Sequence, residues 1–353
     1  MQLRPVRNAC FVGNDMWFIS RGVNALFKYN RKSNMVEYFA LPGHIYLDFM
    51  NLSTYHYDGK IYLVPVYNKG FGKYDITNHS FTSIITDNSK SKCNFNYSFR
   101  FDNNIFCVPN DIDGPFVCFG MCEEKEIREA IYLLKELKQE NNFGAVQQIS
   151  DTRYCGVLTP SNSIYILDLT TGKFETFVNG AIDQKINSIY IKDNYIYITV
   201  VRRLIVTDLE MNILAEHELA TENEAFIIGD YKEYVFVDIV GKPIKYFVKF
   251  DNGAIVAKEF DESNTYIHSD ENRFGIVQYN KEWGEYIYFS GGSNGIFRFN
   301  EIDDSFVFSR MIVDEISRKH LRERFIKELS EGNVCHENSL FGVIDFVSGV
   351  CKF

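Results

Sequence analysis

The stretch STYHYDGKIYLVP, residues 53–65, contains the pattern on which the fold rests. Tyrosines alternate with polar residues up to Asp58 and Gly59, and a second apolar run follows at once. Alternation with a period of two is typical of a half-buried β-strand, and Asp-Gly is a preferred pair in a two-residue hairpin turn. Residues 53–65 are therefore predicted to form a β-hairpin.

The same hairpin pattern occurs seven times along the chain. Asp or Asn stands at each turn, because these side chains bond to their own backbone and tolerate turn geometry. The turn residues are Asn14, Asp58, Asp102, Asp151, Asp193, Asp230 and Asn280. They lie 37 to 50 residues apart, which is the repeat length of propeller blades. Most hairpins precede two more strand-like runs, as in residues 71–84, so one repeat supplies four strands.

These repeats predict an all-β chain that forms one domain over residues 1–353, a seven-bladed β-propeller with four antiparallel strands in each blade. The composition agrees, since 46% of the residues are hydrophobic and 16% are aromatic. A ring of six blades is the alternative, because the third repeat has a helical pattern where its fourth strand is expected.

The last repeat carries a family resemblance. IYFSGG, residues 287–292, is followed by IFRFNEIDDSF, residues 296–306, so a double glycine precedes two aromatic positions on either side of a turn. This arrangement resembles kelch-type propeller repeats, and it implies the same propeller architecture. The double glycine occurs in this repeat alone, whereas the strand pattern extends over nearly the whole chain. No Trp-Asp dipeptide, the mark of another propeller class, occurs.

Two segments have helical rather than strand periodicity. In residues 123–141, Ile127, Ile131 and Leu134 fall on one face, which predicts an amphipathic helix inserted in blade three. Residues 313–331 repeat this pattern and predict a capping helix after blade seven; the inward positions are Ile316, His320 or Leu321, Phe325 and Leu329. Residues 338–353 are apolar and strand-like, and they are expected to pack against a blade or pair with it.

Charge and hydropathy narrow the classes of function. The net charge of −10 argues against a general nucleic-acid binder, because such proteins concentrate Lys and Arg to replace the counterions of the phosphate backbone. No segment approaches the roughly 20 apolar residues of a membrane span, and residues 1–14 lack the apolar run of a signal peptide. The expected location is the cytoplasm.

The eight cysteines indicate reduced, buried thiols rather than disulfides or a metal site. They are scattered, and several stand inside apolar strand-like runs. Cys118 and Cys122 lack a second pair at zinc-finger spacing, and His336 beside Cys335 has no partner at helical spacing. No metal and no cofactor are expected.

The loops that join the second and third strands of each blade are the candidate site, because rigid scaffolds carry function on variable loops. Together they supply a partly basic, amide-rich surface for an anionic or sugar-like ligand, since guanidinium groups bind carboxylate or phosphate in pairs. The candidate ligand-binding residues are Arg21, Tyr67, Asn68, Lys69, Asp111, Asp113, Asn162, Arg202, Arg203 and Lys242.

Three acidic or basic residues leave a catalytic alternative open. Asp111 and Asp113 could serve as a carboxylate pair on a carbohydrate, and His56 could face the central channel. Neither a nucleophile elbow nor a phosphate loop accompanies them. The sequence therefore favours a non-catalytic binding or scaffolding propeller that recognises a protein, peptide or glycan-like ligand. The alternative is a carbohydrate-active lyase or hydrolase with its site at the mouth of the ring.

Overall fold

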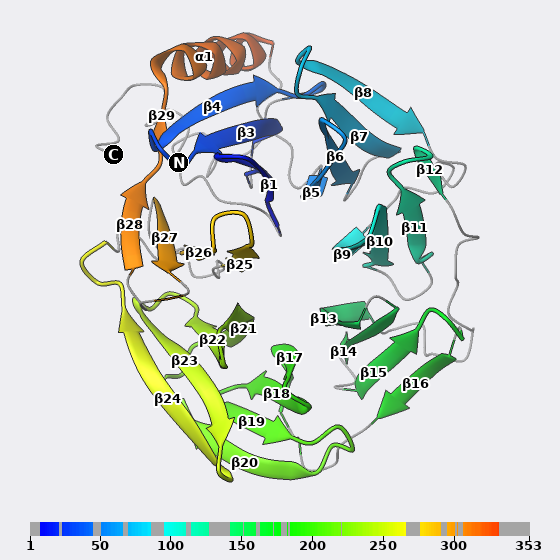
Figure 1. Ribbon diagram of the computed structural model, residues 1–353, viewed down its shortest axis with the longest axis vertical. Coiled ribbons are helices and arrows are strands. Elements are labelled where there is room, and N and C mark those ends of the chain that lie inside the picture. Colours follow the sequence, from blue (N-terminus) through cyan, green and yellow to red (C-terminus); the bar gives the residue numbers. More distant parts are fainter. Residues whose placement is uncertain are drawn as a thin grey trace.

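The computed structural model describes residues 8–20, 23–44, 51–65, 70–85, 95–110, 114–126, 142–150, 152–159, 163–171, 173–177, 182, 184–219, 221–265, 276–290, 295–300, 302 and 306–331. Seven sheets, antiparallel apart from one short parallel pairing, stand around a central axis, as Figure 1 shows. The chain is a seven-bladed β-propeller, which confirms the predicted fold and rules out six blades.

In each blade the strands follow one another outward in chain order. Blade 1 contains β1 (Cys10–Val12), β2 (Asp15–Ile19), β3 (Ala25–Asn30) and β4 (Met35–Ala40). Blade 2 contains β5 (Asn51–Tyr57), β6 (Lys60–Pro65), β7 (Gly70–Asp75) and β8 (Ser80–Ile85). Blade 3 contains β9 (Phe95–Phe101), β10 (Asn104–Pro109), β11 (Val117–Gly120) and β12 (Lys125–Glu126). Blade 4 contains β13 (Asn142–Ser150), β14 (Arg153–Thr159), β15 (Ser163–Asp168) and β16 (Lys173–Phe177).

The remaining blades have the same order. Blade 5 contains β17 (Ser188–Lys192), β18 (Tyr195–Val200), β19 (Arg203–Thr207) and β20 (Ile213–Glu218). Blade 6 contains β21 (Ala225–Tyr231), β22 (Tyr234–Ile239), β23 (Ile244–Asp251) and β24 (Ala254–Asp261). Blade 7 contains β25 (Ile276–Asn280), β26 (Glu285–Phe289), β27 (Gly295–Asn300) and β28 (Phe306–Arg310). The chain then forms β29 (Ile312–Val313) and α1 (Glu315–Ser330).

The burial of each strand follows from its place in the blade. β6 and β18 are second strands with a neighbouring blade on each face, and their side chains are buried almost throughout. β20 is an outer strand, and its side chains alternate between half-buried and exposed. Aromatic rings fill the spaces between blades: Phe71 stacks on Phe119 with ring centroids 4.1 Å apart. The core therefore consists of layers between blades rather than one central cluster.

The predicted turn residues fall at or near the first turn of each blade. Gly13 and Asn14, Asp58 and Gly59 and, in blade 5, Asp193 all lie in the turn itself. In blades 6 and 7 the turns begin later, at residues 232 and 281, so Asp230 lies inside β21 and Asn280 ends β25. Asp151 lies outside the described residues.

The helix predicted at 123–141 is wrong where the structure describes it. Residues 121–124 form a turn and β12 pairs with β11, which gives blade 3 a short fourth strand. The cause is tertiary: the Glu124 carboxylate lies 2.6 Å from Lys73 Nζ and accepts a bond from the Tyr62 hydroxyl, both in blade 2. These contacts override the local helical pattern. Residues 127–141 lie outside the described part of the chain.

The second predicted helix is present as α1, and it packs on the outer strand β4 of blade 1 (Figure 1). Leu321 and Phe325 are buried as predicted, but Ile316 is 69% exposed and Ser317 takes the inward position. The reason is a bond from the Tyr38 N–H to Ser317 Oγ. The Arg324 guanidinium also holds the helix against blade 1. It donates hydrogen bonds to the Tyr38 hydroxyl and to the backbone carbonyls of residues 24, 41 and 43.

The ring closes between blades 7 and 1 through side chains and one short strand. The Gln278 amide donates to the Ala9 carbonyl at 2.6 Å and accepts from the Ala9 N–H at 3.0 Å. Trp283 Nε1 donates to the Gly13 carbonyl at 2.6 Å. β29 adds to blade 1 by pairing in parallel with β4. Blade 1 thus has five strands, with contacts from blade 7 at its inner edge and β29 at its outer edge.

We expect Gln278→Leu to lower the free energy of unfolding by roughly 1–3 kcal/mol, because both backbone groups of Ala9 lose their partner. Urea unfolding followed by fluorescence measures the loss. Gln148→Leu is the matched control, since among the described residues the side chain of Gln148 bonds to Tyr154 alone, at 3.5 Å. Equal losses for the two variants would contradict a role for Gln278 in closure.

Candidate functional site

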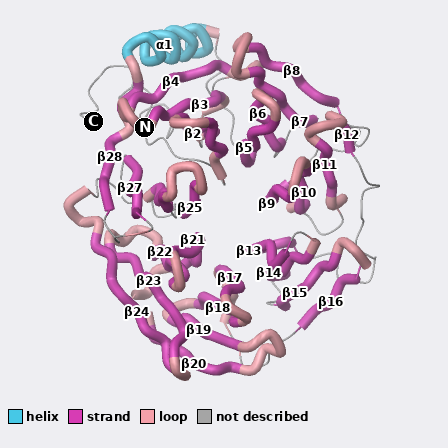
Figure 2. The backbone as a smooth tube through the Cα atoms, in the orientation of Figure 1, coloured by secondary structure: helices cyan, strands magenta, loops and turns pink. Residues whose placement is uncertain are grey.

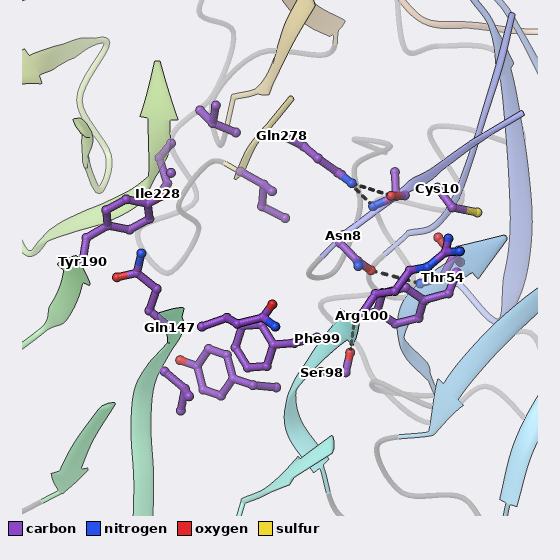
Figure 3. Close-up of a pocket in the computed structure, with 18 of the residues that line it drawn as sticks. Asn8, Cys10, Thr54, Ser98, Phe99, Arg100, Gln147, Tyr190, Ile228 and Gln278 are labelled. Carbon is purple, nitrogen blue, oxygen red and sulfur yellow. Dashed lines mark hydrogen bonds between the residues drawn. The ribbon is translucent and has the colours of Figure 1, made fainter. Parts of the chain in front are cut away.

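A cavity of about 1120 Å³ occupies the centre of the ring. The first strands of all seven blades line it, namely β1, β5, β9, β13, β17, β21 and β25. The backbone tube in Figure 2 shows β5, β9, β13, β17, β21 and β25 at the inner edge of the ring. Figure 3 shows Gln147 and Tyr190 on one side of the open centre and Asn8, Gln278 and Arg100 on the other. We call this cavity the channel. Its hairpin-turn end carries the first turn of each blade, and the opposite end of the ring, with the second-to-third loops, is the loop face.

Several polar side chains of the channel hold neighbouring blades together. The Gln147 amide donates to the Ile191 carbonyl at 3.0 Å and accepts from the N–H of the same residue. Asn8 Oδ1 accepts from the Thr54 N–H at 3.1 Å, and Ser188 Oγ accepts from the N–H of residue 227 at 2.7 Å. Because these groups are already bonded, the middle of the channel presents mainly apolar and aromatic surface to a ligand.

Charged side chains line the hairpin-turn end of the channel. Blade 2 contributes His56 and Asp58, blade 3 contributes Arg100, and blade 7 contributes Lys281 and Glu282. Positive and negative groups are therefore interspersed around this end.

His56 takes its electrostatic character from these neighbours. Partial burial lowers the pKa of His56, and the positive charge of Arg100 lowers it further, while Glu282 and Asp58 oppose the shift. The imidazole is consequently neutral at neutral pH. His56 lines the central channel, which the sequence had left open as one possibility.

Cys10 also lines the channel, but its thiol is not activated. Burial raises the pKa of Cys10 to about 12, against smaller opposing effects from Thr54 and Arg100. The thiolate, which is the nucleophilic form, is therefore scarce at neutral pH.

Most of the predicted loop-face residues lie outside the part of the chain that the structure describes. Those outside the described residues are Arg21, Tyr67, Asn68, Lys69, Asp111, Asp113 and Asn162.

The three described loop-face residues do not line the channel. Arg202 stands in the two-residue turn between β18 and β19 with φ of 64° and pairs with Glu222. Arg203 begins β19, and its Nη1 lies 3.0 Å from Glu216 Oε2. Lys242 lies in blade 6, where its carbonyl accepts a bond from another lysine. Ligand binding by these residues stays a prediction.

Sequence reasoning overlooked the channel strands because their polar residues look like ordinary strand residues. One signal was present: Val-Gln occurs at residues 146–147 and again at 277–278, shortly before the first turn of blades 4 and 7. Both glutamines bond to the backbone of the next blade. A repeated polar residue at one blade position therefore indicates a contact between blades.

A buried charged cluster, Asp238, Lys245, Glu262 and Ser290, joins blades 6 and 7. Lys245 Nζ lies 2.5 Å from Asp238 Oδ1 and 3.6 Å from Glu262 Oε1, and it donates to the Ile239 carbonyl at 3.0 Å. The hydroxyl of Ser290, in blade 7, donates to Glu262 Oε1 at 2.8 Å. Burial raises the pKa of Glu262 to about 7, although Lys245 and Ser290 act against the shift.

Two further classes of site were sought in the described ranges. Within them, no group of three or more His, Cys, Asp or Glu side chains is placed to hold a metal ion. No helix in the same ranges is long and apolar enough to cross a membrane.

Comparison with solved structures finds other β-propellers, whereas comparison of the sequence with known families and curated proteins finds no match. The resemblance to kelch-type repeats therefore stays a prediction. Virginiamycin B lyase from Staphylococcus aureus is similar in structure, with a TM-score of 0.56 and 11% identity over 81% of this chain and 91% of that one.

Two further solved structures are similar. PorZ, a surface component of the type-IX secretion system of Porphyromonas gingivalis, has a TM-score of 0.56 and 10% identity over 88% of this chain and 39% of its own. The β-propeller domain of Myceliophteria thermophila Cps50 (Swd1) has a TM-score of 0.51 and 9% identity over 76% and 88%. At these identities the likeness extends to the β-propeller architecture and no further.

Proposed function

We propose that the chain is a binding or scaffolding propeller that holds a segment of a protein, peptide or glycan-like ligand in the channel. One observation carries this proposal: the cavity of about 1120 Å³ is lined from all seven blades. A cavity of this size that combines apolar walls with a few convergent polar groups is typical of a ligand site.

The chemistry of the lining supports binding over reaction. Several polar groups of the channel, among them Gln147 and Gln278, are engaged between blades, and the thiol of Cys10 is protonated at neutral pH. Phe99, Ile228 and the ring of Tyr190 border the open centre (Figure 3). Rigid aromatic and aliphatic surface supplies binding energy at little cost in conformational entropy.

A second candidate function is favoured by one residue. His56 is neutral at neutral pH and lies at the charged end of the channel, where Glu282 influences its pKa. A neutral imidazole near a carboxylate is suited to general base chemistry. A carbohydrate-active lyase or hydrolase is therefore the alternative, with His56 as base.

The test is to fill the channel. Ile228→Trp adds a bulky ring to a half-buried position in the channel wall, whereas Leu214→Trp adds the same ring to the exposed outer strand β20. We expect tagged wild type and Leu214→Trp to retain the same partner or ligand from the source cells. The amount of ligand recovered with Ile228→Trp should be at least about tenfold smaller, since the added ring occupies the space of the ligand. Circular dichroism checks that both variants fold.

Two further measurements distinguish the channel proposal from a loop-face site and from an enzyme. If Arg202→Ala/Arg203→Ala loses the ligand and Ile228→Trp keeps it, the site is the loop face and the channel proposal is wrong. Mass spectrometry of the recovered ligand tests for reaction. A chemically altered ligand with wild type, and an intact one with His56→Gln, would favour the enzyme.

A further inference from the structure

Arg100 stands out among the channel residues because its guanidinium is fixed by backbone groups. Nε donates to the Asp102 carbonyl and Nη1 donates to the His56 carbonyl, both at 2.9 Å. These two acceptors belong to different blades and cannot change protonation state. The guanidinium is therefore held in place before any ligand arrives, which lowers the entropy cost of binding.

The positive charge of Arg100 has no carboxylate partner in the described part of the chain. No carboxylate of the described residues lies within ion-pair distance of it, and the side chain is exposed. Its charge instead acts on its surroundings and lowers the pKa values of His56 and Cys10. Nη2 remains available to donate, and an arginine so placed suits a carboxylate oxygen.

The neighbouring charges limit what kind of anion fits. Asp58 and Glu282 line the same end of the channel and repel a ligand with many negative charges. Lys281 is the second cation among the described residues that line this end. The arrangement therefore suits a ligand with an isolated carboxylate in an otherwise neutral segment.

The backbone of β9 favours a peptide as the source of that carboxylate. Among the described strands β9 pairs with β10 alone, at the inner edge of its sheet, and its residues 97–100 line the channel. Side chains of neighbouring blades cover the backbone at Ala9, just before β1, and at Ile191 of β17. No side chain among the described residues bonds in this way to the backbone of residues 99–101. An extended peptide can add to such an edge by main-chain hydrogen bonds.

We propose that Arg100 recognises the carboxylate of a single acidic residue in an extended, otherwise neutral peptide segment bound in the channel. This inference rests on the proposed function and deepens it. The peptide would lie along β9 with its acidic side chain on the guanidinium.

The test uses two capped pentapeptides, Gly-Val-Glu-Val-Gly and Gly-Val-Gln-Val-Gly, titrated into the full-length protein and followed by calorimetry and by the Nε–H NMR signals of arginine. We expect the Glu peptide to bind at least about tenfold more tightly than the Gln peptide, since a charge-assisted bond is replaced by a neutral one. Arg100→Gln should remove this preference, and Arg100→Lys should keep part of it. Arg310→Gln, an exposed arginine on β28, is the matched control and should keep it in full.

Each other outcome counts against the inference. Equal affinity for the two peptides, or an unchanged preference in Arg100→Gln, overturns it. A trigalacturonate that binds at Arg100 while the Glu peptide does not would assign the carboxylate to a glycan and overturn the peptide assignment. If Ile228→Trp loses the cellular ligand and Arg100→Gln keeps it, the channel function stands and only this inference fails.

Discussion

Replacing Lys245 with Ala should be among the most destabilising single changes in this propeller. Lys245 is 2% exposed and is the cation of a cluster that also buries Asp238 and Glu262. Removing it leaves two carboxylates in the interior without a counter-charge. Breaking a buried ion pair in this way typically costs about 3–5 kcal/mol. We expect a loss of that size in the free energy of unfolding, measured by urea denaturation.

The matched control is Lys249→Ala on the same strand. Lys249 Nζ lies 3.4 Å from Asp251, but this pair is at the surface, and exposed pairs contribute about 0–1 kcal/mol. If Lys245→Ala is too unstable to purify, Lys245→Met/Asp238→Asn/Glu262→Gln keeps the volume and removes every charge. We expect this triple variant to be more stable than Lys245→Ala. A triple variant as unstable as the single one would show that the loss comes from packing rather than from charge.

The cluster illustrates which parts of the structure were accessible from sequence. Strand alternation, turn residues and repeat length are local patterns, so they predicted seven blades of four strands correctly. The contact of Asp238 with Lys245 and Glu262 depends on the register of three strands and on the turns between them. Nothing in the spacing of these three residues distinguishes them from surface charges.

The wrong helix prediction also has its origin in contacts between blades. Residues 123–126 have a helical pattern, but Glu124 is held by Lys73 and Tyr62 from another blade. The loop-face site is a separate case and stays a prediction, because most of its residues lie outside the described part of the chain. The channel was not predicted, because its lining residues come together only when the ring closes. Arg100 reads as one polar residue in the strand pattern FNYSFRF. Its contact with blade 2 forms only when the ring brings the His56 carbonyl within reach of the guanidinium.

The second large expected effect is a change in the stability of the protein with pH. Burial raises the pKa of Glu262 from its ordinary value of 4.5 to about 7, with Asp238 adding to the rise and Lys245 and Ser290 opposing it. The folded chain therefore binds this proton more tightly than the unfolded chain does. The resulting stability is fully present below about pH 4.5 and is lost as the pH rises through about 7. At about 1.4 kcal/mol for each pH unit, this carboxyl makes the protein about 3 kcal/mol less stable at pH 8 than at pH 4.5.

Glu262→Gln should remove this contribution, because the amide is neutral at every pH. The measurement is the difference in unfolding free energy between wild type and Glu262→Gln from pH 5 to pH 8, in which contributions from the histidines cancel. We expect the unfolding free energy of Glu262→Gln to increase relative to that of wild type as the pH rises. Glu222→Gln, whose side chain is 83% exposed, is the matched control and should give no pH-dependent difference. A difference for Glu262→Gln that stays constant with pH would mean that Glu262 remains ionised throughout, and that Lys245 and Ser290 outweigh its burial.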